Sequence, residues 1–225
     1  ARSRETVLVT GETGVGKELI AEAVHAASGR TDPFIRVNSA GLDDQMFADT
    51  LFGHRKGAYT GASDARKGLI AAAGSGTVFL DEIGDLNTAS QVKLLHLLER
   101  REYYPLGADL PRRTDARFVV ATHRNLRQMA SSGDFRKDLY YRLSTHEVHV
   151  PPLRDRTSDI PMLLRHFLCI ACKELERPEP DMSPELSSLL KNYTFPGNVR
   201  ELRSLVFDAV ARSTGAVVPS KLFEN

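Results

Sequence analysis

The chain has 225 residues, a formal net charge of +1 and 26% charged residues. This length fits one large domain, or one domain with a small satellite. The balanced charge excludes an overall basic field for nucleic-acid binding. The sequence contains no run of 18 apolar residues, so it predicts no membrane-spanning helix. Residue 1 leads directly into a predicted strand without a secretion leader, so we expect a cytoplasmic protein.

Strands and helices alternate through the first two thirds of the chain. Short apolar, β-branched runs predict strands at residues 6–10, 33–38, 76–80, 116–121 and 146–150. Amphipathic stretches between them predict helices at residues 18–28, 43–51, 89–101, 125–131 and 134–142. This alternation favours an α/β domain with a parallel sheet covered on both faces.

The pattern changes at a proline-led linker, residues 151–156, after which only helices are predicted. These lie at residues 160–176, 183–192 and 198–213, and Ser183 and Pro184 supply a cap and a first-turn proline for the second. We therefore predict an α/β domain at 1–152, a helical subdomain at 153–215 and a tail at 216–225.

Two cysteines, Cys169 and Cys172, lie in an apolar stretch of the first of these helices. A redox or metal-binding pair is the alternative, but the sequence has no second pair of cysteines. We expect two small buried side chains in a reducing compartment.

A glycine-rich loop follows the first predicted strand and opens the first predicted helix. It has the spacing GxxxxGK and consists of Gly11-Glu12-Thr13-Gly14-Val15-Gly16-Lys17. In this context backbone N–H groups surround nucleotide phosphates, and Lys17 reaches the β- and γ-phosphates. The next residue is Glu18, where the general pattern has Ser or Thr for magnesium, so Thr13, water or Asp81 must serve the metal.

Two adjacent acids, Asp81 and Glu82, follow the third predicted strand. Asp81 is placed to hold Mg²⁺ through water, and Glu82 to polarise the attacking water as a general base. Because adjacent side chains on a strand point to opposite sides, we expect the two acids to have separate roles. With the phosphate loop, they predict ATP hydrolysis.

Arg136 and Arg142 are candidate arginine fingers. An arginine delivered to the γ-phosphate by a neighbouring subunit raises the rate by roughly 10³–10⁵. Around one straight helix the two positions are about 240° apart, so both serve one phosphate only if the helix ends between them. The alternative is that they are surface arginines paired with Asp134 or Asp138.

Three further residues have both a functional and an ordinary interpretation. Asn38 ends the second strand, where it either restrains Glu82 or forms a strand-end turn. His123 follows the fourth strand, where it either senses the γ-phosphate or is a turn histidine. Arg200 opens the last helix, where it either reaches the nucleotide or forms a salt bridge.

A second glycine-rich segment lies between the phosphate loop and the acidic pair. Its sequence is Gly57-Ala58-Tyr59-Thr60-Gly61-Ala62. Glycines on both sides of an aromatic residue and a hydroxyl residue predict a mobile loop tip that presents Tyr59 and Thr60 to a protein partner. The alternative is a plain surface turn.

Together these residues resemble the central domain of bacterial enhancer-binding proteins, the AAA+ activators of the sigma-54 form of RNA polymerase. The resemblance runs across nearly the whole chain. It rests on the phosphate loop with Glu18, on segments 51–62, 79–84, 135–143, 151–156 and 196–202, and above all on the loop at 57–62, usually written GAFTGA.

The resemblance implies a five-stranded AAA+ P-loop NTPase sheet with a small helical lid. It implies a ring, hexameric or heptameric, with ATP and Mg²⁺ at subunit boundaries, where Arg136 and Arg142 act on the neighbour's ATP. Asn38 would restrain Glu82, and the GAFTGA-type loop would contact sigma-54 while a second loop, residues 106–113, moves with it. Turnover would remodel a closed promoter complex into an open one. DNA would be bound only by a separate domain, so we expect an excised central domain.

The sequence departs from the family pattern at three positions. Tyr59 replaces Phe and keeps an aromatic contact. His123 replaces Asn in the first sensor, and Arg55 replaces Glu beside the loop, which reverses a charge. Two competing interpretations follow: a nucleotide-binding scaffold with poor turnover, and an AAA+ motor of another kind that acts on DNA or unfolds proteins.

Overall fold

The computed structural model describes residues 4–177, 181–182, 190–213 and 217–218, the second and fourth of these ranges by backbone alone. Contacts divide the chain into two compact units. The first comprises Ala1–Thr10 and Lys17–His149, and the second comprises Gly11–Gly16 and Val150–Asn225. The glycines of the phosphate loop thus group with the C-terminal unit. None of the described helices is long and apolar enough to cross a membrane.

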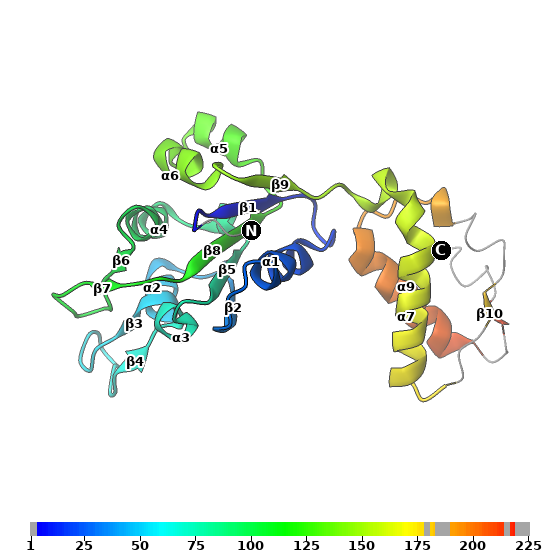
Figure 1. Ribbon diagram of the computed structural model, residues 1–225, viewed down its shortest axis with the longest axis horizontal. Coiled ribbons are helices and arrows are strands. Elements are labelled where there is room, and N and C mark those ends of the chain that lie inside the picture. The colour runs from blue at the N-terminus through cyan, green and yellow to red at the C-terminus, as the bar shows by residue number, and fades with distance from the viewer. Residues whose placement is uncertain (1–3, 178–180, 183–189, 214–216, 219–225) are drawn as a thin grey trace. The chain divides into compact units, whose positions relative to one another are not determined.

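A five-stranded sheet forms the centre of the first unit (Figure 1). Its order is β2-β5-β8-β1-β9, and every neighbouring pair is parallel. The strands are β1 (Val7–Thr10), β2 (Phe34–Asn38), β5 (Thr77–Asp81), β8 (Arg117–Thr122) and β9 (Glu147–His149). The predicted parallel sheet is confirmed, because buried β-branched runs without alternating polar residues are typical of parallel strands.

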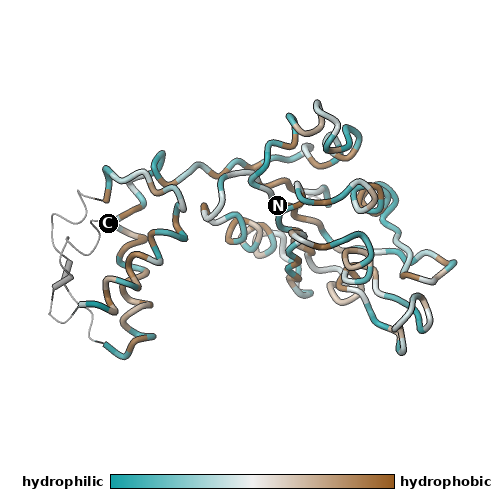
Figure 2. The backbone as a smooth tube through the Cα atoms, turned by 180° about the vertical axis from the view of Figure 1, so that it is seen from behind, coloured by the Kyte–Doolittle hydropathy of each residue, from teal (hydrophilic) through white to brown (hydrophobic). Residues whose placement is uncertain are grey.

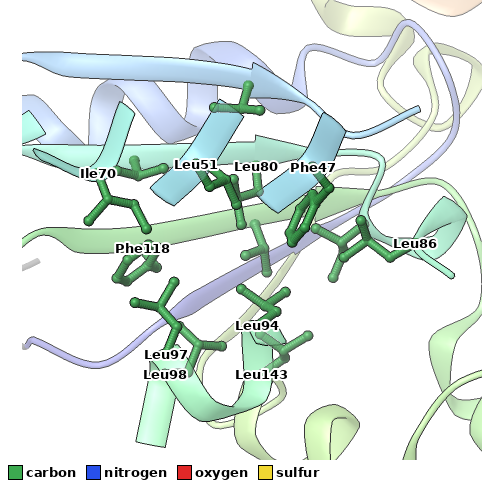
Figure 3. Packing of buried hydrophobic residues seen from close by; sticks show 14 of the residues in the cluster. Phe47, Leu51, Ile70, Leu80, Leu86, Leu94, Leu97, Leu98, Phe118 and Leu143 are labelled. Carbon is green, nitrogen blue, oxygen red and sulfur yellow. The ribbon is translucent and has the colours of Figure 1, made fainter. Parts of the chain in front are cut away.

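Helices cover both faces of this sheet, and side-chain alternation decides which strand residues face them. Helix α1 (Lys17–Ala26) lies against β1, β5 and β8. Leu80 and Phe118 point to the opposite face, where they meet Phe47 and Leu94 in one buried cluster (Figure 3). The helices on that side include α2 (Asp44–Phe52), α3 (Leu69–Ala73) and α4 (Thr88–Arg100).

Short polar side chains start three helices of this unit. Asp43 accepts a hydrogen bond from the N–H of Met46 before α2, and Asn87 accepts one from Ser90 before α4. Asn125 caps α5 (Leu126–Ser132) in the same way, and α6 (Lys137–Leu143) follows after a glycine stop at Gly133. Such caps satisfy N–H groups that have no partner inside the helix.

Two small antiparallel hairpins were not predicted. The first joins β3 (Gly53–His54) to β4 (Arg66–Lys67), and the second joins β6 (Glu102–Tyr103) to β7 (Arg112–Arg113). Each strand has two residues, which is too short for an apolar–polar alternation to be visible in sequence. The first hairpin carries the loop at residues 57–62, and the second carries the loop at residues 106–113.

The second unit is built on two helices, α7 (Ile160–Glu174) and α9 (Asn198–Arg212). Hydrophobic positions recur along both helices (Figure 2), and they form a separate core. The expected linker at residues 151–156 contains the 3₁₀ turn η2 (Leu153–Asp155), whose Leu153 is fully buried; η3 (Thr157–Asp159) follows. The described backbone also has a two-stranded sheet, β10 (Asp181–Met182) with β11 (Val217–Val218).

Three expectations about this unit need comment. Cys172 is buried as expected, but Cys169 is exposed, because it lies on the outer side of α7. The helix predicted at residues 183–192 falls mostly outside the described residues. The tail predicted at 216–225 also lies outside them, except for residues 217 and 218.

Candidate functional site

The acidic pair lies at the C-terminal edge of the sheet, where parallel α/β sheets place their sites. Asp81 is the last residue of β5, but Glu82 already lies outside the strand. Its backbone is left-handed, with φ 55° and ψ 45°. Glu82 therefore leaves the line of the strand, and the expected reason for separate roles, alternation along a strand, does not apply to this pair. A left-handed conformation is strained for a glutamate, and strained residues of this kind cluster at functional sites.

Burial and charge distinguish the two acids. Burial raises the pKa of Asp81, and the negative charge of Glu82 raises it further, while Lys17 opposes the shift. The Lys17 side chain is only 7% exposed, and its Nζ lies 3.9 Å from Glu82 Oε1. This corner of the sheet therefore concentrates two carboxylates around one buried ammonium group.

His123 contacts Glu82 directly. Its Nδ1 lies 2.7 Å from Glu82 Oε2, and its backbone N–H lies 3.3 Å from the same oxygen. Because an ionised carboxylate only accepts, the ring nitrogen must donate this hydrogen bond. His123 was predicted as a γ-phosphate sensor or a turn residue, and the structure instead places it on the candidate general base.

Asn38 ends a strand next to β5, and the register pairs it with Asp81, the residue before the Glu82 that we expected it to restrain. Its Oδ1 accepts a hydrogen bond from the N–H of Ala40 at 2.9 Å, as a strand-end turn residue does. Within the described part of the chain it has no hydrogen bond to Glu82. The neighbouring Ser39 hydroxyl is buried and has no hydrogen-bond partner among the residues that the structure describes.

Glu18 occupies the position where other phosphate loops have a metal-binding hydroxyl. Its carboxylate pairs with Arg36 Nη1 of β2 at 2.7 Å. The Arg36 side chain also pairs with Glu22 one turn further along α1. Glu18 therefore anchors α1 to the sheet, and its carboxylate is engaged there.

The glycine loop has the backbone that phosphate binding requires. Gly11, Gly14 and Gly16 have φ values of 148°, 79° and 103°, which other residues rarely adopt. A Cβ on Gly14 would lie 2.4 Å from the carbonyl oxygen of Gly197. Among the described residues, the N–H groups of Thr13, Gly14, Val15 and Gly16 have no hydrogen-bond acceptor. Free N–H groups of this kind bind anions.

Sequence reasoning missed the residues of the second unit that hold this loop. Asn198 is fully buried; its Nδ2 donates to Glu12 Oε2 and to the Thr13 carbonyl oxygen, both at 3.0 Å. Its Oδ1 accepts from the N–H of Leu153 at 2.8 Å. Arg156 donates to the Val15 carbonyl oxygen at 2.6 Å. In the sequence, the arginines of the 151–156 segment and the Gly197–Asn198 turn are the features that could have indicated these contacts.

Glu12 forms the charged part of this attachment. Nη1 and Nη2 of Arg154 donate to its two carboxylate oxygens, at 2.9 and 2.5 Å. The Arg154 and Asn198 hydrogen bonds lower the pKa of Glu12 to about 2. Arg200 follows Asn198 in α9, and its Cβ lies 3.1 Å from the point where a Cβ on Gly14 would stand. In the described structure the Arg200 guanidinium forms no salt bridge, which was the alternative interpretation of this residue.

The two candidate arginine fingers occupy different environments. Arg136 precedes α6 and forms two hydrogen bonds to Asp138, at 3.0 and 2.7 Å. Arg142 lies in the last turn of α6, 3.2 Å from Glu5, and donates to the Leu98 carbonyl oxygen. The helix does not end between them; it begins after Arg136. Within one chain, Arg136 shows the predicted alternative pairing with Asp138.

The GAFTGA-type loop closes on itself. The N–H of Gly57 donates to the Ala62 carbonyl oxygen at 2.9 Å, and that of Ala62 to Tyr59 at 3.0 Å. Thr60 is exposed, whereas Tyr59 is half-buried against the ring of His54. At the tip, therefore, the Thr60 side chain is exposed, whereas the Tyr59 ring is partly covered by His54.

The second loop contacts the first. The N–H of Arg55 donates to the Leu106 carbonyl oxygen at 3.0 Å, and the N–H of Leu106 donates to the Gly53 carbonyl oxygen at 2.8 Å. A Cβ on Gly107 would lie 2.9 Å from the Cβ of Ala58. The residue at 55, whose charge departs from the family pattern, thus lies where the loops at 57–62 and 106–113 meet.

Comparison with known proteins agrees with this architecture. The family model for the sigma-54 interaction domain matches residues 1–149, and that for the AAA+ ATPase lid domain matches residues 154–225. The chain is 44% identical over 222 residues to the regulatory protein AtoC of Escherichia coli, covering 98% of this chain and 48% of that protein. It is 43% identical over 231 residues to the transcriptional regulator NtrC of Klebsiella pneumoniae, covering 100% and 49%.

Solved structures show the same fold. NtrX from Brucella abortus superimposes with a TM-score of 0.90 at 31% identity, covering 99% of this chain and 51% of that one. The same protein in complex with ATP gives a TM-score of 0.88 at 30% identity, covering 98% and 51%. The chain spans about half the length of the curated relatives it matches. It belongs to the sigma-54 interaction domain family, with an AAA+ lid domain after it.

Proposed function

We propose that this chain is the ATP-hydrolysing module of a sigma-54-dependent transcription activator. Its turnover would remodel the closed complex of sigma-54 RNA polymerase into an open one. The observation that carries the proposal is the Glu82 carboxylate, held in a strained backbone between Lys17 and His123 beside Asp81. Family membership and the ATP complex of NtrX from Brucella abortus support it.

The residues present fit ATP and Mg²⁺. The free N–H groups of residues 13–16 suit phosphate oxygens. Burial and, after it, the charge of Glu82 raise the pKa of Asp81, and a divalent cation would stabilise the charged carboxylate against both effects. Asp81 would hold Mg²⁺ through water, with Thr13 or water in place of the missing hydroxyl at position 18. The metal, when bound, neutralises charge on the phosphates.

Glu82 is the residue that would accept a proton from the attacking water. In the described structure one of its oxygens carries two hydrogen bonds from His123. An oxygen that already accepts two hydrogen bonds is engaged, so this arrangement describes a base at rest. Turning the His123 ring away removes the shorter of these two hydrogen bonds and leaves that of the backbone N–H, while Lys17 stays near the other oxygen.

Ring assembly belongs to the same proposal. Arg136 and Arg142 would act on ATP held by a neighbouring subunit in a hexamer or heptamer. Arg136 is suited to this because its pairing with Asp138 is exposed, and exposed pairs break at little cost. Arg200, next to Gly14 and without an ion pair among the described residues, would contact the phosphates from α9.

The GAFTGA-type loop would bind sigma-54 through Tyr59 and Thr60. Its contacts with the second loop give a path by which both move together. Arg55 and Lys56 are too few to form a convincing DNA track, so DNA is expected to be bound by another domain.

One observation favours a second candidate. His123 replaces the family's Asn and holds Glu82 directly, which would suit a nucleotide-binding scaffold with weak turnover. Steady-state ATP hydrolysis separates the two functions. We expect turnover by the unmodified chain, retained nucleotide binding without turnover in Glu82→Gln, and no stimulation by DNA. Nucleotide binding without turnover in the unmodified chain would favour the scaffold, and DNA-stimulated hydrolysis would favour another kind of motor.

A further inference from the structure

The GAFTGA-type loop leaves the first unit through a tightly packed base. The strands β3 and β4 approach so closely that a Cβ on Gly53 would lie 2.2 Å from the Arg66 carbonyl oxygen. A Cβ on Gly68 would lie 2.3 Å from the Leu51 carbonyl oxygen. Both contacts are with backbone atoms that cannot move aside without distorting the hairpin. The direction in which the loop leaves is therefore set at this base.

His54 lies at the base and contacts three parts of the loop's surroundings. Its side chain is only 9% exposed. Nδ1 faces Oδ1 of Asp49, in the last turn of α2, and Nε2 lies 2.8 Å from the carbonyl oxygen of Asp64 on the returning side of the loop. Its ring centre lies 5.2 Å from that of Tyr59, with the planes at 65°.

Both hydrogen-bond partners of the ring are acceptors. A carboxylate oxygen and a carbonyl oxygen have no hydrogen to give, and a neutral imidazole donates from one nitrogen only. The second nitrogen of a neutral ring would turn its lone pair toward an oxygen. The two contacts are satisfied together only when His54 carries a proton on each nitrogen.

The charged neighbours of His54 are consistent with a protonated ring. Asp49 supplies a carboxylate from α2, and its other oxygen accepts a hydrogen bond from Arg66 Nη1 of β4 at 2.8 Å. The loop itself brings the Asp64 backbone and the Tyr59 ring. From the second loop only the backbone of Leu106 pairs with residue 54. The edge-to-face geometry with Tyr59 is compatible with a charged ring.

We propose that His54 is a positioning residue for the loop tip, acting as a doubly protonated imidazole that ties Asp49 to Asp64 and fixes the ring of Tyr59. Loss of either proton would break one tie and release one side of the loop. The inference rests on the proposed function in one respect only: Tyr59 is taken to contact sigma-54. The position of the ring itself does not depend on that assumption.

A tryptophan reporter tests the position without any partner. The chain has no Trp, so Tyr59→Trp introduces a single one beside His54. A protonated imidazole quenches indole emission, so emission should rise by about twofold when the pH is raised and the ring loses its proton. His54→Asn and His54→Gln in the same background each preserve one of the two hydrogen bonds and cannot titrate, so their emission should be flat.

The control is His166→Gln, which removes an exposed histidine of α7 in the other unit and should leave the pH step intact. Two variants that retain different hydrogen bonds guard against a simple folding defect, which circular dichroism would reveal in either. The absence of a pH step with His54 present would overturn the proposal. A step that persists in both His54 variants would overturn it as well.

Capture of sigma-54 factor then tests the functional consequence. Without the reporter, His54→Asn and His54→Gln should capture it about three- to tenfold more weakly, the range expected for one lost hydrogen bond. Their ATP turnover should be unchanged, because His54 lies outside the acidic pair. Capture equal to that of the unmodified chain would refute the positioning role. If the unmodified chain captures nothing, the proposed function fails, and the reporter result still decides the position of His54.

Discussion

Glu82 allows backbone strain to be separated from catalysis. Its left-handed conformation, with φ 55°, costs an L-amino acid roughly 1–2 kcal/mol. Glycine adopts this conformation freely, but its greater freedom in the unfolded chain costs about 0.5–1 kcal/mol relative to alanine. We therefore expect Glu82→Gly to be more stable than Glu82→Ala by about 0.5–1 kcal/mol.

The two variants form a matched pair. Both remove the carboxylate, its contacts with Lys17 and His123, and its effect on Asp81, so their difference reports the backbone alone. Neither should hydrolyse ATP. For a chain of this size the stability difference corresponds to a gain of roughly 1–4 °C in Tm.

Urea unfolding followed by circular dichroism measures this difference. Glu99 on the exposed side of α4 serves as the control, because there the glycine variant should be less stable than the alanine variant by about 0.5–1 kcal/mol. If Glu82→Gly were no more stable than Glu82→Ala, the strain argument would be refuted. Measurable turnover by either variant would remove Glu82 from the general-base role.

Three further predictions concern other parts of the site. Arg136→Ala should still bind ATP but lose turnover, by roughly 10³-fold or more; unchanged steady-state hydrolysis would remove Arg136 from the finger role. Thr60→Ala should keep ATPase activity and lose sigma-54 capture, while Tyr59→Phe should retain both; normal capture by Thr60→Ala would contradict the role of the loop tip. Asp81→Asn should be more stable than the unmodified chain at neutral pH, as measured by urea unfolding. Burial raises the pKa of Asp81 above its ordinary 3.8, so charging this carboxyl costs the folded state free energy as the pH rises through the raised pKa, and asparagine avoids this cost. This advantage should disappear below about pH 3.8, and a variant less stable at neutral pH would show that the carboxylate is stabilising there.

The sheet and its order of elements were predictable because their signals are local. A buried parallel strand is a continuous apolar run, and a helix shows its period over three turns. Glycine spacing and the acids at a strand end likewise depend on a few adjacent residues. The two hairpins were not predictable, because strands of two polar residues such as Arg112–Arg113 carry no period.

The remaining parts of the site depend on contacts between distant residues. Asn198 contacts Glu12, which lies 186 positions earlier, and His123 contacts Glu82 because one residue adopts a left-handed backbone. No local pattern indicates that a glutamate after a strand will turn in this way. The same holds for His54, whose role follows from having acceptors at both nitrogens.

The proposed function, in which ATP turnover remodels the sigma-54 polymerase complex, requires the state of the nucleotide site to control the loop that carries Tyr59 and Thr60. Native gel electrophoresis of this chain with purified sigma-54 factor, in ADP–aluminium fluoride and in ADP alone, tests it most directly. The account predicts a shifted complex only with the transition-state mimic. A complex of equal amount in both conditions, or none in either while ATP hydrolysis is intact, would contradict it.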